Sequence, residues 1–140
     1  MISTGFDDYP RGHFHEGELH VDLICWMIAL TDTLAKIAIL LKYTSDFTEY
    51  EQVKSYMLNN LDAIHWNDEF NLYCDVSIND DGTVFSLTVD VKLVLGKQYH
   101  AIHRGYVSLF PFLFGYVDAD SIKLGFILDM MSDAEHLWSE

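Results

Sequence analysis

The chain has 140 residues, half of them hydrophobic and 14% aromatic, which suits one packed domain, or part of one, and argues against disorder. Asp and Glu outnumber Lys and Arg by 22 to 8, and the formal charge of −14 repels phosphate backbones, so we expect no nucleic-acid partner. Two cysteines are too few for a disulfide framework, and Cys25, in an apolar run, favours a buried free thiol.

The first residues carry no targeting signal that the sequence reveals. Residues 1–5 lack the basic and apolar regions of a signal peptide. The apolar stretch 19–41 is interrupted by four titratable residues, which disfavour a membrane span: His20, Asp22, Asp32 and Lys36. If the parent protein is secretory, we expect its targeting or anchoring segment to lie outside this sequence.

The first half of the chain predicts a loop followed by two helices. Glycines and Pro10 interrupt residues 3–17, as is typical of a loop. Residues 18–42 have helical spacing and are apolar on nearly every face, which predicts an internal helix or one packed between two layers. Thr48 followed by Glu51 resembles a capping box and predicts a second helix up to about residue 64.

The second half predicts a hairpin and then more helix. Residues 70–78 and 83–95 are rich in β-branched and aromatic types, and the sequence Asn-Asp-Asp-Gly at 79–82 suits a turn between them. Residues 96–105 look irregular. Residues 106–117 favour a helix that Pro111 must start or kink, and Asp118-Ala119-Asp120-Ser121 is placed to cap a last helix over about 121–131. Helices arriving in pairs predict a mainly α fold of α/α architecture.

The loop Gly5-Phe6-Asp7-Asp8-Tyr9-Pro10-Arg11 is the first candidate for chemistry. A carboxylate in a rigid loop beside aromatic residues can have the raised pKa that a general acid needs, whereas a nearby Arg lowers it. The alternative is that Asp7 and Asp8 are ordinary turn residues, which the residue types alone favour.

Glu18 and Asp22 are the second candidate, because spacing of four would place both carboxylates on one face of the predicted helix. Acidic residues on so apolar a helix need a reason such as a polar cleft, although a helix N-terminus also favours carboxylates. The histidine pairs at 13 and 15 and at 100 and 103 complete no familiar ligand set, so we expect no metal. The aromatic residues at 106–116, like Trp26, are more often core than a sugar platform. There is no phosphate loop or nucleophile elbow, and we expect no cofactor.

Five blocks give the chain a family resemblance. The Gly5–Arg11 loop, residues 18–26, residues 61–66, residues 105–111 and residues 136–139 resemble, in this order, the processing α-glucosidase I family, the mannosyl-oligosaccharide glucosidases. Residues 67–104 match poorly. The resemblance implies that residues 1–140 are a fragment of a C-terminal catalytic domain, part of an (α/α)6 toroid with a β-hairpin excursion around residues 70–95.

The resemblance also implies an activity, a substrate and a site. It implies inverting hydrolysis of the terminal α-1,2-linked glucose of the glucosylated high-mannose N-glycan precursor in the endoplasmic reticulum lumen, by a parent protein anchored in the membrane. Asp7 would be the general acid. Arg11, Glu18, Asp22 and Trp26 would bind substrate or shape the site.

The chain departs from the family in one respect. The expected catalytic base belongs to a segment beyond the Trp138-Ser139 motif, and neither Glu135 nor Glu140 has a base-like setting. We therefore expect this polypeptide to be inactive by itself. Two alternatives stay open: another inverting (α/α)6 glycosidase such as a trehalase-like enzyme, and a non-catalytic carbohydrate-binding helical module.

Overall fold

The computed structural model of the chain describes residues 18–78, 98–101 and 105–133. The predicted N-terminal loop, with Asp7 and Arg11, lies outside these residues, as do the predicted turn at 79–82 and the predicted strand 83–95.

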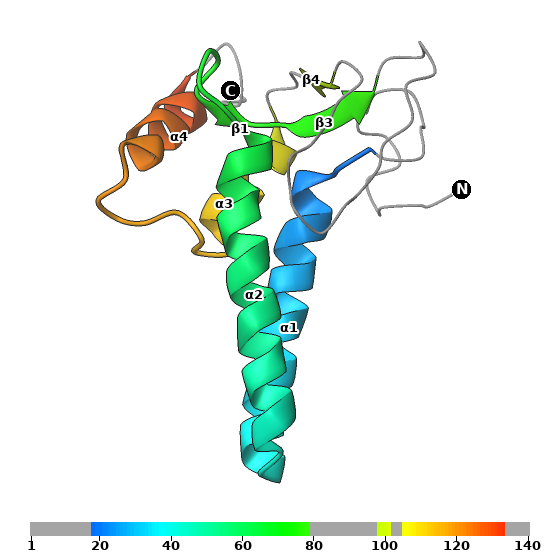
Figure 1. Cartoon of the computed structure of the whole chain (residues 1–140). Helices are drawn as coiled ribbons and strands as arrows, with labels where there is room; N and C mark the ends of the chain where they lie inside the picture. Colours follow the sequence, from blue (N-terminus) through cyan, green and yellow to red (C-terminus); the bar gives the residue numbers. More distant parts are fainter. Residues whose placement is uncertain (1–17, 79–97, 102–104, 134–140) are drawn as a thin grey trace.

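Two long helices form a hairpin that extends away from the remaining elements (Figure 1). Helix α1 spans Val21–Leu41, helix α2 spans Thr44–His65, and they run side by side in opposite directions. The chain reverses at Lys42, which adopts a left-handed conformation (φ 63°) and donates its backbone N–H to carbonyls of the last turn of α1. Such a residue ends a helix because it turns the following backbone away from the helix axis.

Helix α1 buries one face only. Its buried residues recur every three or four positions and become small toward the hairpin end, so that α2 can approach closely: Val21, Asp22, Cys25, Ile28, Thr31, Ala35 and Ala38. By contrast, Leu23, Trp26 and Leu30 are each about half exposed. The prediction that α1 is covered on nearly all sides is therefore wrong for the described part of the chain, because hydropathy does not tell which apolar face meets a neighbour.

Both helix starts differ from the predictions. Helix α1 begins at Val21 rather than residue 18, because Leu19 is engaged in an isolated antiparallel bridge with Val76. Helix α2 begins at Thr44, one turn before the predicted cap. Thr48 lies inside the helix, where its hydroxyl donates to the Thr44 carbonyl at 3.0 Å, so the capping box is not used.

Two small antiparallel strand pairs follow α2. Strand β1 (Trp66–Asn67) pairs with β2 (Leu72–Tyr73), and β3 (Asp75–Ile78) pairs with β4 (Gln98–Ala101). The predicted strand 70–78 is therefore divided, and the prediction that residues 96–105 are irregular is wrong at β4. The turn between β1 and β2 is stabilised by the side-chain oxygen of Asn67, which accepts the backbone N–H groups of Glu69 and Phe70.

The C-terminal predictions are confirmed for the last helix, whereas the helix predicted over residues 106–117 is shorter and divided. A 3-10 turn, η1 (Tyr106–Leu109), leads into the short helix α3 (Phe110–Leu113), where Pro111 lies in the first turn. Helix α4 spans Ile122–Ser132, and the Ser121 hydroxyl accepts the Lys123 backbone N–H at 3.3 Å. The core is formed by buried residues of α1, α2, β2, η1, α3 and α4: Val21, Cys25, Ile28, Leu61, Tyr73, Val107, Leu109, Phe110 and Ile127. Trp66 of β1 is partly buried against it.

The fold class is confirmed as mostly helical with small antiparallel strand pairs. Within the described residues, α1 is also long and apolar enough to cross a membrane when only length and composition are considered. The expectation that its charged residues preclude a span does not hold by that criterion. The same helix carries a core face packed against α2 and α3, which gives its apolar composition a second explanation.

Candidate functional site

The candidate site lies where α1 begins, at the end of the helix pair that meets the strands (Figure 1). Of the five residues that the sequence singled out, Glu18, Asp22 and Trp26 are in the described part of the chain. Asp7 and Arg11 are not, although the segment that carries them directly precedes Glu18 in the sequence.

The start of α1 is fixed by a strand rather than by a local cap. His20 occupies the N-cap position, and its side chain makes no capping hydrogen bond. Instead, the Asp75 carboxylate on β3 accepts the Val21 backbone N–H at 2.9 Å. Leu19 and Val76 exchange two backbone hydrogen bonds, each 2.9 Å long. A carboxylate at a helix N-terminus satisfies a backbone donor and is stabilised by the helix dipole, so Asp75 replaces the missing cap.

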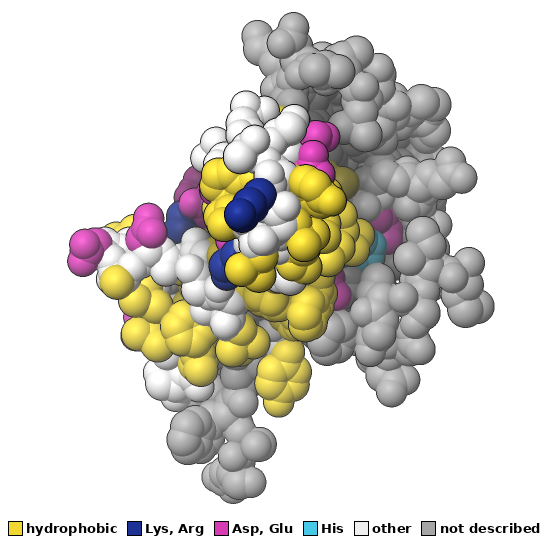
Figure 2. Space-filling model, turned by 90° about the horizontal axis from the view of Figure 1, so that it is seen from below, with side chains coloured by type: hydrophobic (Ala, Val, Ile, Leu, Met, Phe, Trp, Pro, Cys, Tyr) yellow, Lys and Arg dark blue, Asp and Glu magenta, His cyan; other side chains and the backbone are white. Residues whose placement is uncertain are grey.

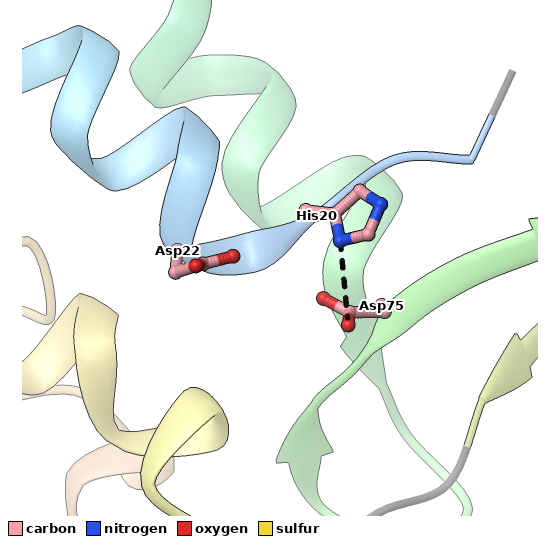
Figure 3. Close-up of side chains that lie close together, drawn as sticks. All are labelled: His20, Asp22 and Asp75. Carbon is pink, nitrogen blue, oxygen red and sulfur yellow. Dashed lines mark ion pairs between the residues drawn. The ribbon is translucent and has the colours of Figure 1, made fainter. Parts of the chain in front are cut away.

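His20 faces the Asp75 carboxylate (Figure 3), and its ring also lies near Glu18. Its Nδ1 is 3.8 Å from an oxygen of Asp75, and its Nε2 is 3.6 Å from an oxygen of Glu18. Asp22 follows in the first turn of α1 and is 2% exposed. We call Glu18, His20, Asp22 and Asp75 the N-terminal polar cluster.

From the sequence, Glu18 and Asp22 are grouped because of an expected common helix face, and the structure corrects that reason. Glu18 and Asp22 do not share a helix face, because Glu18 precedes the helix. They belong to one cluster because His20 contacts Glu18, while one nitrogen of His20 and one oxygen each of Asp22 and Asp75 lie within 4.8 Å of one another. Sequence reasoning missed Asp75, and no local pattern signals it, since it is 54 positions from Val21.

One buried histidine and two buried thiols lie outside the polar cluster. His65 donates its Nδ1–H to the Cys74 carbonyl at 2.8 Å, and burial lowers the pKa of its imidazole, an effect that this hydrogen bond partly opposes. Burial raises the pKa of the Cys25 and Cys74 thiols to about 12, and the neighbouring Asp22 and Asp75, respectively, add to the effect. These thiols are therefore protonated and unsuited to nucleophilic chemistry.

His100 links β4 to the end of α2 in a defined tautomer. Because the Asn67 side-chain oxygen accepts the turn amides, its NH2 group faces His100 Nδ1 at 2.7 Å and donates to it. His100 Nε2, 3.0 Å from the Ile64 carbonyl, must then carry the proton. His100 is thus a structural bridge, as expected for a satisfied histidine.

Trp26 belongs to a different group of side chains. Its indole packs edge-on against Phe114 and Phe110, with ring centroids 4.8 Å and 6.3 Å apart, and Phe114 stacks on Tyr116. More than half of the Trp26 side chain is exposed, so it keeps a free ring surface. The aromatic residues of the C-terminal segment thus pack as a cluster, while Trp26 extends that cluster to the surface of α1.

The polar cluster also contains side-chain types that bind metal ions. One ring nitrogen of His20 and one carboxylate oxygen each of Asp22 and Asp75 lie within 4.8 Å of one another, although one Asp75 oxygen accepts the Val21 N–H. Carboxylates held in this way can equally accept hydrogen bonds from hydroxyl groups, as sugar recognition requires.

Comparison with known families places the chain. The family model described as "Glycosyl hydrolase family 63 C-terminal domain" matches residues 1–140. The chain therefore belongs to glycosyl hydrolase family 63, a family of glycosidases, in agreement with the resemblance noted from the sequence.

Individual relatives agree with this assignment. The chain is 34% identical over 140 residues to a mannosyl-oligosaccharide glucosidase of Saccharomyces cerevisiae, and 33% identical over 139 residues to a probable mannosyl-oligosaccharide glucosidase of Schizosaccharomyces pombe. It is also 33% identical over 159 residues to "Alpha-glucosidase 2" of Arabidopsis thaliana. Each match covers 99% of this chain, but only 15%, 16% and 20% of the respective relatives.

Proposed function

We propose that the protein carrying this chain is a mannosyl-oligosaccharide glucosidase, which hydrolyses the terminal α-1,2-linked glucose of glucosylated high-mannose N-glycans with inversion. The observation that carries the proposal is the N-terminal polar cluster, because it gathers Glu18 and Asp22 directly after the Asp7 segment in a chain of family 63. The relatives' names support a glucosidase over a trehalase-like enzyme or a non-catalytic module.

In the proposed reaction, the Asp7 carboxyl protonates the glycosidic oxygen while the bond to glucose breaks. A second carboxylate, expected in a segment beyond the Trp138-Ser139 motif, activates water on the opposite face of the sugar. In inverting enzymes these two carboxyl groups lie roughly 6.5–9.5 Å apart, which leaves room for the water. The product of an α-linked substrate is then β-glucose.

The substrate-binding roles follow from the residue chemistry. Glu18 and Asp22 accept hydrogen bonds from sugar hydroxyls and orient the loop that carries Asp7. Arg11 shapes the site beside Asp7. Trp26, whose ring surface is partly exposed, stacks against a sugar ring.

The proposed architecture is an (α/α)6 toroid in which α1 and α2 form one of the helix pairs. The half-exposed apolar residues of α1 support this proposal, since neighbouring helices of a ring would cover such a face. We further propose that the protein acts in the endoplasmic reticulum lumen and is anchored in the membrane, where its N-glycan substrate is found.

The decisive experiment follows the anomer of the released sugar. The complete protein is incubated with an oligosaccharide that ends in α-1,2-linked glucose, and the product is observed by proton NMR before mutarotation. We expect β-glucose, and we expect Asp7→Asn to reduce kcat by about 100-fold or more, since it removes the proton donor. Initial release of α-glucose, or an Asp7→Asn variant as fast as the wild type, would overturn the proposal.

A further inference from the structure

We propose that Asp75 is a positioning residue for the hydrolysis: from strand β3 it fixes the backbone at the start of α1, and thereby the placement of Glu18 and Asp22. The inference rests on the proposed function. It concerns a residue that the sequence analysis did not single out, and it assigns Asp75 no contact with the substrate.

The first support is the construction of the helix start. The first turn of an α-helix leaves backbone N–H groups without partners in the helix, and a side chain at the N-cap ordinarily accepts one of them. His20 makes no such bond. The Asp75 carboxylate accepts the Val21 N–H instead, so the position at which α1 begins depends on a residue of β3.

The second support is that Asp75 acts beside a backbone connection. Leu19 and Val76 are joined by two hydrogen bonds, so three consecutive residues, 19–21, are attached to two consecutive residues of β3. Strand β3 is itself paired with β4 over four residues. Residues 19–21, directly before and at the start of α1, are thus held against a paired strand.

The third support is that one carboxylate reaches two parts of the cluster. While one Asp75 oxygen accepts the Val21 N–H, the other lies 3.8 Å from His20 Nδ1, and the opposite side of the His20 ring faces Glu18. Glu18 and Asp22 flank the three attached residues in the sequence. A shift of this backbone would therefore move both carboxylates together.

Rates of hydrolysis depend steeply on such placement. A displacement of about 1 Å of a catalytic or orienting group can cost about 100-fold in rate, even when the change is made away from the reacting atoms. A residue that only stabilises the fold changes the amount of folded enzyme, but not the kcat of each folded molecule. This difference makes the inference testable.

The test compares three variants of the complete protein, assayed with the α-1,2-glucosylated oligosaccharide and corrected for the folded fraction. Asp75→Ala removes the acceptor for the Val21 N–H, and we expect kcat to fall about 10- to 100-fold with a smaller change in KM. Asp75→Asn keeps an oxygen in the same place, and we expect kcat within about fivefold of the wild type. Val76→Ala is the matched control, because it removes buried side-chain atoms from the neighbouring position while leaving its backbone bridge, and kcat should be unchanged.

Asp75→Glu provides a second variant in case Asp75→Ala does not fold. It keeps the charge but moves the carboxylate, so we expect the same loss of kcat. If the alanine variant, or the glutamate variant in its place, has the kcat of Val76→Ala with only a lower Tm, Asp75 is merely structural and the inference is wrong. A wild-type protein that releases no glucose would instead show that the proposed function has failed.

Discussion

The two ends of the α1–α2 hairpin differ in side-chain polarity and burial. At the end where α1 begins, Glu18, His20, Asp22 and Asp75 are largely buried, His20 lies within 3.8 Å of oxygens of Glu18 and Asp75, and Asp75 accepts the Val21 N–H. The opposite end, around the reversal at Lys42, presents apolar side chains to solvent (Figure 2), all of them more than 40% exposed: Ile37, Ile39, Leu40, Leu41 and Tyr43.

The contrast separates two kinds of residue on one hairpin: those that make specific polar contacts at one end, and apolar residues that face solvent at the other. The polar end depends on partners far away in the sequence, so a single substitution there has a defined geometric consequence. The hairpin end is apolar without a partner among the described residues, so its side chains add little to the stability of the folded chain. We therefore expect function at the polar end, whereas the hairpin end should tolerate substitutions that keep its side chains apolar.

The largest effect on stability should come from the core face of α1. Ile28 is 1% exposed, whereas Ile39, on the same helix, is 56% exposed. We expect Ile28→Ala to lower the free energy of unfolding by about 2–5 kcal/mol, because it leaves a cavity, and Ile39→Ala to change it by about 0.5 kcal/mol or less. Urea denaturation of the two variants measures the difference. Equal losses would mean that the hairpin end is as well packed as the core.

A smaller effect should appear in the pH dependence at the polar end. Burial lowers the pKa of His65, so the unfolded chain binds the proton more tightly than the folded chain. The contribution of His65 to stability is therefore complete above the unfolded pKa of about 6.5 and is lost as the pH falls below it, by at most about 1.4 kcal/mol per pH unit.

His65→Asn is the matched control, since its amide can donate to the Cys74 carbonyl as His65 Nδ1 does but does not titrate. Urea midpoints between pH 7 and pH 5 should show a shallower decline for this variant than for the wild type. Parallel curves for the two proteins would show that His65 is not held neutral in the folded state.

Local signals predicted the elements better than the contacts between them. The cap of α4 within residues 118–121 and the place of Pro111 in the first turn of α3 were predictable, because both depend on residues a few positions away. The strand β4 was not, since its partner β3 lies about 20 residues earlier and short strands carry little periodicity. Likewise, the choice of which α1 face is buried depends on α2 and α3 rather than on α1.

The candidate site likewise contains residues that local sequence signals predicted and one that they could not predict. Glu18 and Asp22 were singled out because acidic residues are unusual beside so apolar a helix, and both prove to be largely buried. The expectation that the two residues share a helix face was wrong, because Glu18 precedes α1. Asp75 could not be found at all, because its role depends on an antiparallel bridge between Leu19 and Val76 that no local pattern encodes.

The most direct test of the account compares one substitution at each end of the hairpin. In the complete protein, we expect Asp22→Asn, which keeps the shape of the side chain and removes its charge, to reduce kcat/KM for the α-1,2-glucosylated oligosaccharide by about 100-fold. Leu40→Met, at a residue that is 80% exposed, keeps an apolar side chain of similar size and should leave kcat/KM unchanged. Wild-type kcat/KM in Asp22→Asn, or an equal loss in both variants, would contradict the claim that the polar end of the hairpin is the hydrolytic site.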